Sequence, residues 1–146
     1  MKNLVVLLSL LFVLPAMAQD KIKVKFKVAK EQVLINKVEW AKLEWAANKY
    51  FLSTLSGDEF VSINPLEYGT GRYHSNTGKE IMHKYCEVKF IGVDIPAFEV
   101  DANYNEATKL MYKMNVLIDG KFVLENASKF KEKYQEEVSE KHFLTK

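Results

Sequence analysis

The sequence predicts an α+β fold, a two-layer sandwich in which an antiparallel sheet of about six strands carries two helices on one face. Three observations lead to it: an alternating apolar and basic stretch near the start, several later segments of period two joined by turn residues, and two stretches with helical spacing. The predicted element order is β-α-β-β-β-β-β-α. The chain has 146 residues, 48% hydrophobic and 27% charged, which is the balance of one globular domain.

Residues 1–18 have the form of a secretory signal peptide. Lys2 supplies a basic start, residues 4–14 are apolar apart from one serine, and small residues precede the predicted cleavage site after Ala18. The apolar run is much shorter than the roughly 20 residues that a membrane-spanning helix needs. We therefore expect residues 19–146 to form a single α+β domain that is exported to the periplasm or secreted and does not span a membrane.

The first strand is predicted over residues 21–28, where apolar and basic residues alternate without a break. Successive side chains of a strand point to opposite faces, so one face is apolar and needs cover. We expect the covered face to consist of Ile22, Val24, Phe26 and Val28. The opposite face would carry Lys21, Lys23, Lys25 and Lys27.

A helix is predicted from Lys37 to about Leu52. Asn36 has the form of its N-cap, with Glu39 three residues later as the reciprocal acid. At helical spacing the apolar residues form two stripes, and the second contains Trp45. That second stripe would meet the C-terminal helix or a partner chain. The alternative is one wide core face with Trp45 at its margin.

Short strands are predicted next, at residues 60–63, 66–75 and 81–95. The first of them should end at Pro65, because proline cannot donate a hydrogen bond to a sheet. After the third strand, residues 97–108 are polar and irregular, which predicts a long loop where a mobile lid would lie.

A hairpin and a last helix complete the prediction. Residues 110–125 alternate on both sides of Asp119 and Gly120, a pair typical of a tight hairpin turn. Ser128 would then cap a helix whose apolar face contains Phe130 and Tyr134.

The element order also resembles a small exported bacterial family, a domain of unknown function with a TATA-box-binding-protein-like fold. The resembling features lie roughly within residues 35–128, after a signal peptide that ends at Ala18-Gln19. They are Trp45 followed by Tyr50-Phe51, the strand end Tyr68-Gly69-Thr70-Gly71, and the segment Val116-Leu-Ile-Asp-Gly-Lys-Phe-Val123. The resemblance implies that fold and an exported location. It implies no activity, and the fold name does not imply DNA binding.

No catalytic, metal or cofactor site is predicted. His83 and Cys86 are three residues apart, so they would lie on opposite faces of a strand, and Cys86 is the only cysteine. Residues 71–79 contain glycines and a lysine but lack the spacing of a phosphate-binding loop. The formal net charge of +2 gives no indication of nucleic-acid binding.

A binding surface is the one functional feature that the residues favour. Four lysines along one strand face would form a positive ridge suited to an anionic glycan or an acidic envelope protein. The alternative is that they only keep an edge strand from pairing with other chains. The candidate residues are Lys21, Lys23, Lys25, Lys27 and Trp45.

The leading functional hypothesis is an exported, non-enzymatic binding module of the cell envelope. A second hypothesis is a carrier for an apolar small ligand, held between sheet and helix in a cavity lined by Met82, Met111 and Met114. A third is a hydrolase, which would need His74 or His83 within reach of both a carboxylate and a nucleophile.

Overall fold

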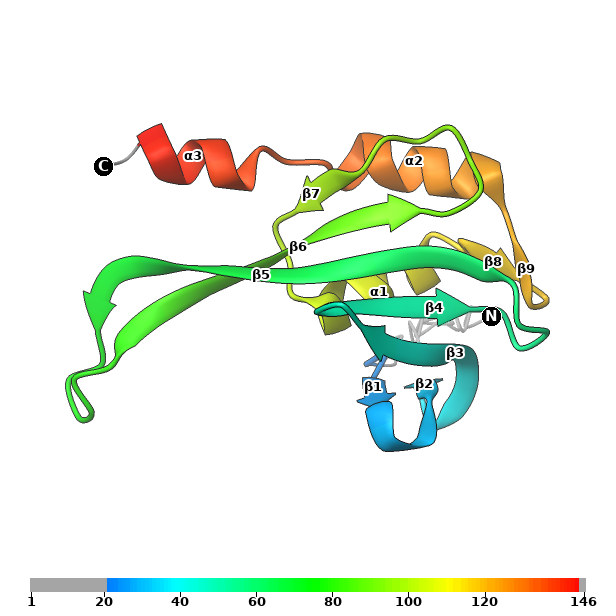
Figure 1. The fold of residues 1–146 in the computed structure, drawn as a ribbon, viewed down its shortest axis with the longest axis horizontal. Helices are drawn as coiled ribbons and strands as arrows, with labels where there is room; N and C mark the ends of the chain where they lie inside the picture. The colour runs from blue at the N-terminus through cyan, green and yellow to red at the C-terminus, as the bar shows by residue number, and fades with distance from the viewer. Residues whose placement is uncertain (1–20, 145–146) are drawn as a thin grey trace, which may run out of the picture.

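The computed structural model describes residues 21–144, which form an α+β fold around a seven-stranded antiparallel sheet (Figure 1). The strands follow one another as neighbours from β1 to β7. The α+β class and the antiparallel sheet are thus confirmed, but the sheet has seven strands rather than about six. The predicted signal peptide lies outside the described residues.

The bounds of the elements are as follows. The main sheet consists of β1 (Val24–Lys27), β2 (Gln32–Ile35), β3 (Val38–Ala46), β4 (Lys49–Ser53), β5 (Glu59–Tyr73), β6 (Glu80–Phe90) and β7 (Phe98–Val100). A short 3-10 helix, η1 (Val28–Lys30), separates β1 from β2. The remaining elements are α1 (Tyr104–Lys113), β8 (Leu117–Ile118), β9 (Lys121–Phe122), α2 (Leu124–Tyr134) and α3 (Val138–Leu144).

One face of the sheet is covered by α1 and α2. Phe130 of α2 lies with its ring centroid 6.0 Å from both Phe90 and Phe98. At the other edge of the sheet, the ring of Phe26 lies 4.9 Å from that of Tyr104 in α1. The helices therefore cover this face from β1 to β7. Its largest completely buried side chains include Phe60, Phe90, Phe130, Leu52, Ile63 and Met111.

The alternation predicted at the first strand holds for most of its length. Lys23 and Lys25 are exposed, whereas Val24 and Phe26 are partly buried. The prediction is wrong at Val28, which is 47% exposed. The strand ends at Lys27, and the chain then turns through η1 toward β2, so Val28 no longer belongs to the covered face.

The helix predicted from Lys37 to Leu52 is wrong, because this segment forms strands β3 and β4. Ala47 and Asn48 join the two strands with φ angles of 48° and 60°, the backbone of a tight hairpin turn. In β3, Ala41 and its alternate neighbour Leu43 are buried. The element order and the number of helices therefore differ from the prediction, since the described chain has three α-helices and all of them follow β7.

A β-bulge at Trp40 hides the period of two in β3. Val33 pairs with Ala41 and Leu34 with Glu39, so Trp40 is an extra residue without a cross-strand partner. Its ring packs edge-on against Phe60 at 5.8 Å. The bulge adds one residue to the alternation, which leaves an apolar spacing that also fits a helix.

Pro65 does not end a strand, because β5 continues through it to Tyr73. The ladder between β4 and β5 reaches only as far as Ile63, so beyond this point one edge of β5 is open. Pro65 pairs with Cys86 on the β6 side. An open edge tolerates proline, since no neighbouring strand requires the missing N–H.

Beyond this point β5 and β6 continue as a two-stranded arm, residues 66–84, that projects from the rest of the sheet (Figure 1). Near its tip the backbone N–H of Gly71 donates to Glu80 Oε1 at 2.8 Å. A Cβ atom at Gly69 would clash with the same carboxylate, so a side chain at this position would displace Glu80 from its contact with Gly71. These contacts give the arm a defined shape.

The long loop predicted at residues 97–108 is also wrong, because β7 and the first half of α1 occupy it. Asn103 caps α1 by accepting a hydrogen bond from Glu106 N at 3.1 Å. In the predicted hairpin at residues 110–125 the turn is correct, with positive φ at Asp119 and Gly120. Only two residues on each side form strand, since the first part of the segment is helical.

The C-terminal helix is divided in two. α2 begins at Leu124 rather than at Ser128, and the backbone of Gln135 pairs with Val100 before α3 begins. The His142 ring of α3 stacks on Tyr68 of the arm with centroids 4.0 Å apart. Tyr68 pairs with His83, so the two side chains lie on the same face. His83 lies three residues before the core residue Cys86 and therefore points to the opposite face. Thus α3 contacts the face of the sheet that α1 and α2 do not cover.

Substitution of Ala47 by glycine distinguishes the hairpin from the helix by the sign of its effect. In the observed turn Ala47 has positive φ, which glycine adopts without strain, so Ala47→Gly should raise the free energy of unfolding by about 1 kcal/mol. In a helix the same change would lower it by about 1 kcal/mol. Urea denaturation measures the difference, and Ala127→Gly within α2 is the helical control, which should be destabilised.

Candidate functional site

Four partly exposed aromatic side chains meet at one edge of the sheet. We call Phe26, Trp45, Tyr50 and Tyr104 the aromatic cluster. The ring of Tyr50 lies 4.4 Å from Trp45, 5.0 Å from Phe26 and 4.7 Å from Tyr104. Trp45 is 42% exposed and the other three rings are partly buried. Four different elements, β1, β3, β4 and α1, thus contribute to one apolar surface that still reaches solvent.

Local structure positions each ring. The hairpin turn after β3 places Trp45 directly across from Tyr50 in the ladder. The Asn103 cap makes Tyr104 the first residue of α1, where it reaches both β1 and β4. Burial and a hydrogen bond with Tyr104 raise the pKa of Tyr50 to about 12. The phenol of Tyr50 therefore stays neutral at physiological pH and does not act as a base.

The predicted lysines lie beside this cluster but on the opposite face of β1. Lys21, Lys23 and Lys25 are exposed and Lys27 is partly buried. Phe26, which alternates with them, points toward the aromatic cluster. Among residues 21–144 none of the four lysines forms an ion pair. The lysines and Trp45, which the sequence predicts to share one binding surface, therefore lie on two neighbouring surfaces.

A groove of about 750 Å³ lies on the side of the sheet where Gln32, Lys42 and Ser53 pair in one row. We call it the acidic groove. Four carboxylates and two ammonium groups line it, and none of the six forms an ion pair with a described residue. They are Glu31, Glu39, Glu44, Glu59, Lys30 and Lys42. Val28 adds apolar surface to its lining, whereas the Trp45 ring lies on the opposite face of β3, against Tyr50.

The sequence prediction missed the acidic groove because it assigned residues 37–52 to a helix. With strands in place, Lys42 and Glu44 lie on one side of β3 while Ala41 and Leu43 are buried on the other. The alternation of apolar and charged residues from Ala41 to Trp45 indicates a strand, and recognising it would have predicted this surface.

His83 has an acidic partner that the sequence did not indicate. Its Nε2 atom lies 2.5 Å from Asp101 Oδ1, and its ring lies 5.0 Å from that of Tyr68. Within residues 21–144 no serine, threonine or cysteine is hydrogen-bonded to His83. A carboxylate thus meets the histidine, as the hydrolase hypothesis requires, but no nucleophile joins them there. His74 is exposed at the arm tip. Its backbone N–H donates to the Lys79 carbonyl, and its carbonyl accepts from the Gly78 N–H.

Cys86 is completely buried in the core. Burial raises the pKa of its thiol to about 12, so the reactive thiolate is scarce at neutral pH. Cys86 and His83 lie on opposite faces of β6, as their spacing predicts. In the described part of the chain, no group of three or more metal-ligating side chains comes together.

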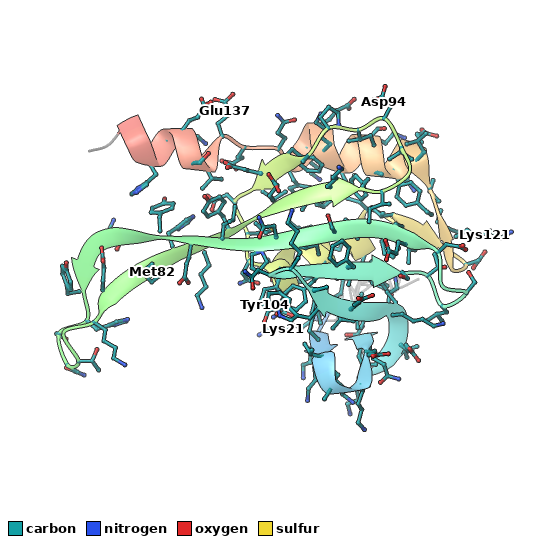
Figure 2. All side chains as sticks on the ribbon, viewed as in Figure 1. Lys21, Met82, Asp94, Tyr104, Lys121 and Glu137 are labelled. Carbon is teal, nitrogen blue, oxygen red and sulfur yellow. The ribbon has the colours of Figure 1, made fainter. Side chains whose placement is uncertain are left out.

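The three methionines of the carrier hypothesis lie in different parts of the molecule. Met82 is 39% exposed and lies on the arm (Figure 2). Met111 is completely buried in the core, and Met114 is partly buried. The expectation that they line one cavity is therefore wrong.

Comparisons of the chain with models of protein families, with curated proteins and with solved structures found no match. The resemblance to the exported family of unknown function therefore stays a prediction. Between residues 21 and 144, no helix has both the length and the apolar character needed to cross a membrane.

The raised pKa of Cys86 predicts how stability depends on pH. Above about pH 9 the unfolded chain loses a thiol proton that the native chain keeps, so unfolding becomes more favourable. The free energy of unfolding should fall by about 1–2 kcal/mol between pH 8 and pH 10. Urea denaturation at each pH measures the fall. A Cys86→Ala variant should lack most of it, and an equal pH dependence in that variant would contradict the assignment.

Proposed function

We propose that this protein is an exported, non-enzymatic binding module of the cell envelope, and that its partner docks on the aromatic cluster. The observation that carries the proposal is the contact of four aromatic rings at a surface that remains partly open to solvent. Aromatic side chains provide a large contact area at a small entropic cost and are enriched where partners bind.

The neighbouring lysines support an anionic partner. Lys21, Lys23 and Lys25 are exposed and form no ion pair with described residues, so their charges are available to a ligand. Such charges act mainly through the rate of association and are screened by salt. The partner would combine an apolar group, placed on the aromatic cluster, with acidic groups that face β1. An acidic segment of an envelope protein fits this chemistry, and an anionic glycan is the alternative that the binding test separates.

The chemistry of the other candidate residues supports binding more than catalysis. His83 contacts Asp101 at the base of the arm, and in the described chain no hydroxyl or thiol is hydrogen-bonded to His83. The only thiol, that of Cys86, lies protonated in the core. The His83 and Asp101 pair thus fits a structural role, together with the stack of Tyr68 on His142, in holding α3 against the arm.

Export is tested by the processing of the full chain. When the complete sequence is expressed in a Gram-negative host, we expect the protein recovered from the periplasm to begin at Gln19. Intact-mass spectrometry measures the N-terminus directly. Full-length protein found only in the cytoplasm would contradict the export part of the proposal without bearing on the binding surface.

Trp45 supplies a direct test of the binding surface. The protein has two tryptophans, so Trp40→Phe leaves Trp45 as the only indole. Titration of this variant with an acidic peptide that contains aromatic residues should change the emission of Trp45. A parallel titration with an oligogalacturonate tests the glycan. Trp45→Ala should weaken binding of the successful probe at least tenfold, measured by calorimetry. Unchanged emission with both probes would contradict the proposed surface.

The contribution of the lysines is measured with the same probe. Lys23→Gln combined with Lys25→Gln should weaken binding about threefold or more at low salt and much less at 0.5 M salt. Lys113→Gln combined with Lys121→Gln changes the net charge equally at exposed positions away from β1 and is the matched control. An equal effect of both pairs would mean that only the net charge matters.

A further inference from the structure

The arm and the acidic groove carry charges of opposite sign that the chain itself does not pair. We propose that the protein associates with copies of itself from head to tail, with the tip of one arm seated in the acidic groove of the next copy. This inference concerns surfaces other than the lysine face and goes beyond the binding function proposed above.

The tip of the arm is basic and has one large aromatic side chain. Residues 71–79 are all exposed and include Arg72 and Lys79 but no acidic residue. Tyr73 is 64% exposed. Neither Arg72 nor Lys79 forms an ion pair with a described residue. The nearest acid, Glu80, is already engaged as the acceptor of the Gly71 backbone N–H. The tip thus presents two free positive charges around an exposed ring.

The acidic groove offers the complementary surface. Its four carboxylates outnumber its two ammonium groups, and these carboxylates have no ion-pair partner among residues 21–144. Val28, which is 47% exposed, provides apolar surface in the same groove that would contact Tyr73. Lys27 lies on the same face of the sheet and pairs with Gln32 of the groove, but neither Lys25 nor Lys27 lines the groove itself. Bringing the two surfaces together would pair charges on both sides, and it would cover the exposed side chains of Tyr73 and Val28.

Geometry requires a second copy. The arm projects away from β2 and β3, whose residues form much of the groove, so the tip of an arm does not reach the groove of its own chain (Figure 1). When each copy places its arm in one neighbour and receives the arm of another, the contact is heterologous, and it builds a ring or an open chain.

The arm is held in shape before any contact is made. The Thr70 hydroxyl donates to the Ile81 carbonyl at 2.7 Å, and the base of the arm is fixed by the contact of His83 with Asp101 and by the stack of Tyr68 on His142. An ordered arm loses little conformational entropy when it docks, which favours association. The side chains of Arg72 and Lys79 take no part in these internal contacts, so they can be exchanged without disturbing the arm.

Sedimentation velocity with charge-exchanged variants tests the proposal. At low salt the average mass of the wild-type protein should rise with concentration, and it should return to that of the monomer at 0.5 M salt. Arg72→Glu combined with Lys79→Glu should weaken self-association at least tenfold. Glu44→Lys combined with Glu59→Lys should do the same. Mixing these two variants should restore association, because each arm then meets a groove of opposite charge.

Controls separate the contact from general charge effects and from misfolding. Lys113→Glu combined with Lys133→Glu makes the same change in net charge at exposed positions that do not line the groove, and it should leave association unchanged. Circular dichroism checks that each variant is folded. If the arm exchange impairs folding, Arg72→Gln combined with Lys79→Gln replaces it and should still weaken association. A monomeric wild-type protein at all concentrations, association unaffected by either exchange, or a monomeric mixture would each overturn the proposal.

Discussion

The pairing of β5 with β6 is the constraint on which the rest of the structure depends. Its inner half carries core residues such as Ile63 and Val88, which pair directly and are completely buried. A shift of one residue would move these side chains to the other face, so burial determines the register of the whole ladder. The outer half of the same ladder has no other strand beside it and becomes the arm. The position of the arm tip is therefore set by packing in the core, far from the tip itself.

The two faces of the sheet differ in burial and polarity because helices cover only one of them along its length. On the covered face, the rings of Phe90 and Phe130 pack against each other in the apolar core. The aromatic cluster lies where this cover ends, so its rings are packed on one side and open on the other. The acidic groove lies where no helix covers the strands, and its charges stay in water. The two surfaces proposed for binding thus lie at the margin and on the uncovered side, while the buried thiol of Cys86 stays protonated at neutral pH.

Self-association and partner binding would use separate sets of charges. The basic tip and the acidic groove complement each other, whereas the lysines of β1 point from an edge strand that the groove does not include. Trp45 belongs to the aromatic cluster, and its ring lies on the face of β3 opposite the groove.

The sequence by itself determined those features that depend on neighbouring residues: the alternation over most of residues 21–28, the turn at Asp119 and Gly120, and the apolar setting of Cys86. It also placed the lysines and Trp45 at the surface. Only the tertiary structure decided that residues 37–52 are strands. Their apolar spacing satisfies a helix as well as a bulged strand, and burial against the neighbouring strands makes the difference. The acidic groove and the contact of His83 with Asp101 join residues distant in sequence, so they exist only once the strands have paired.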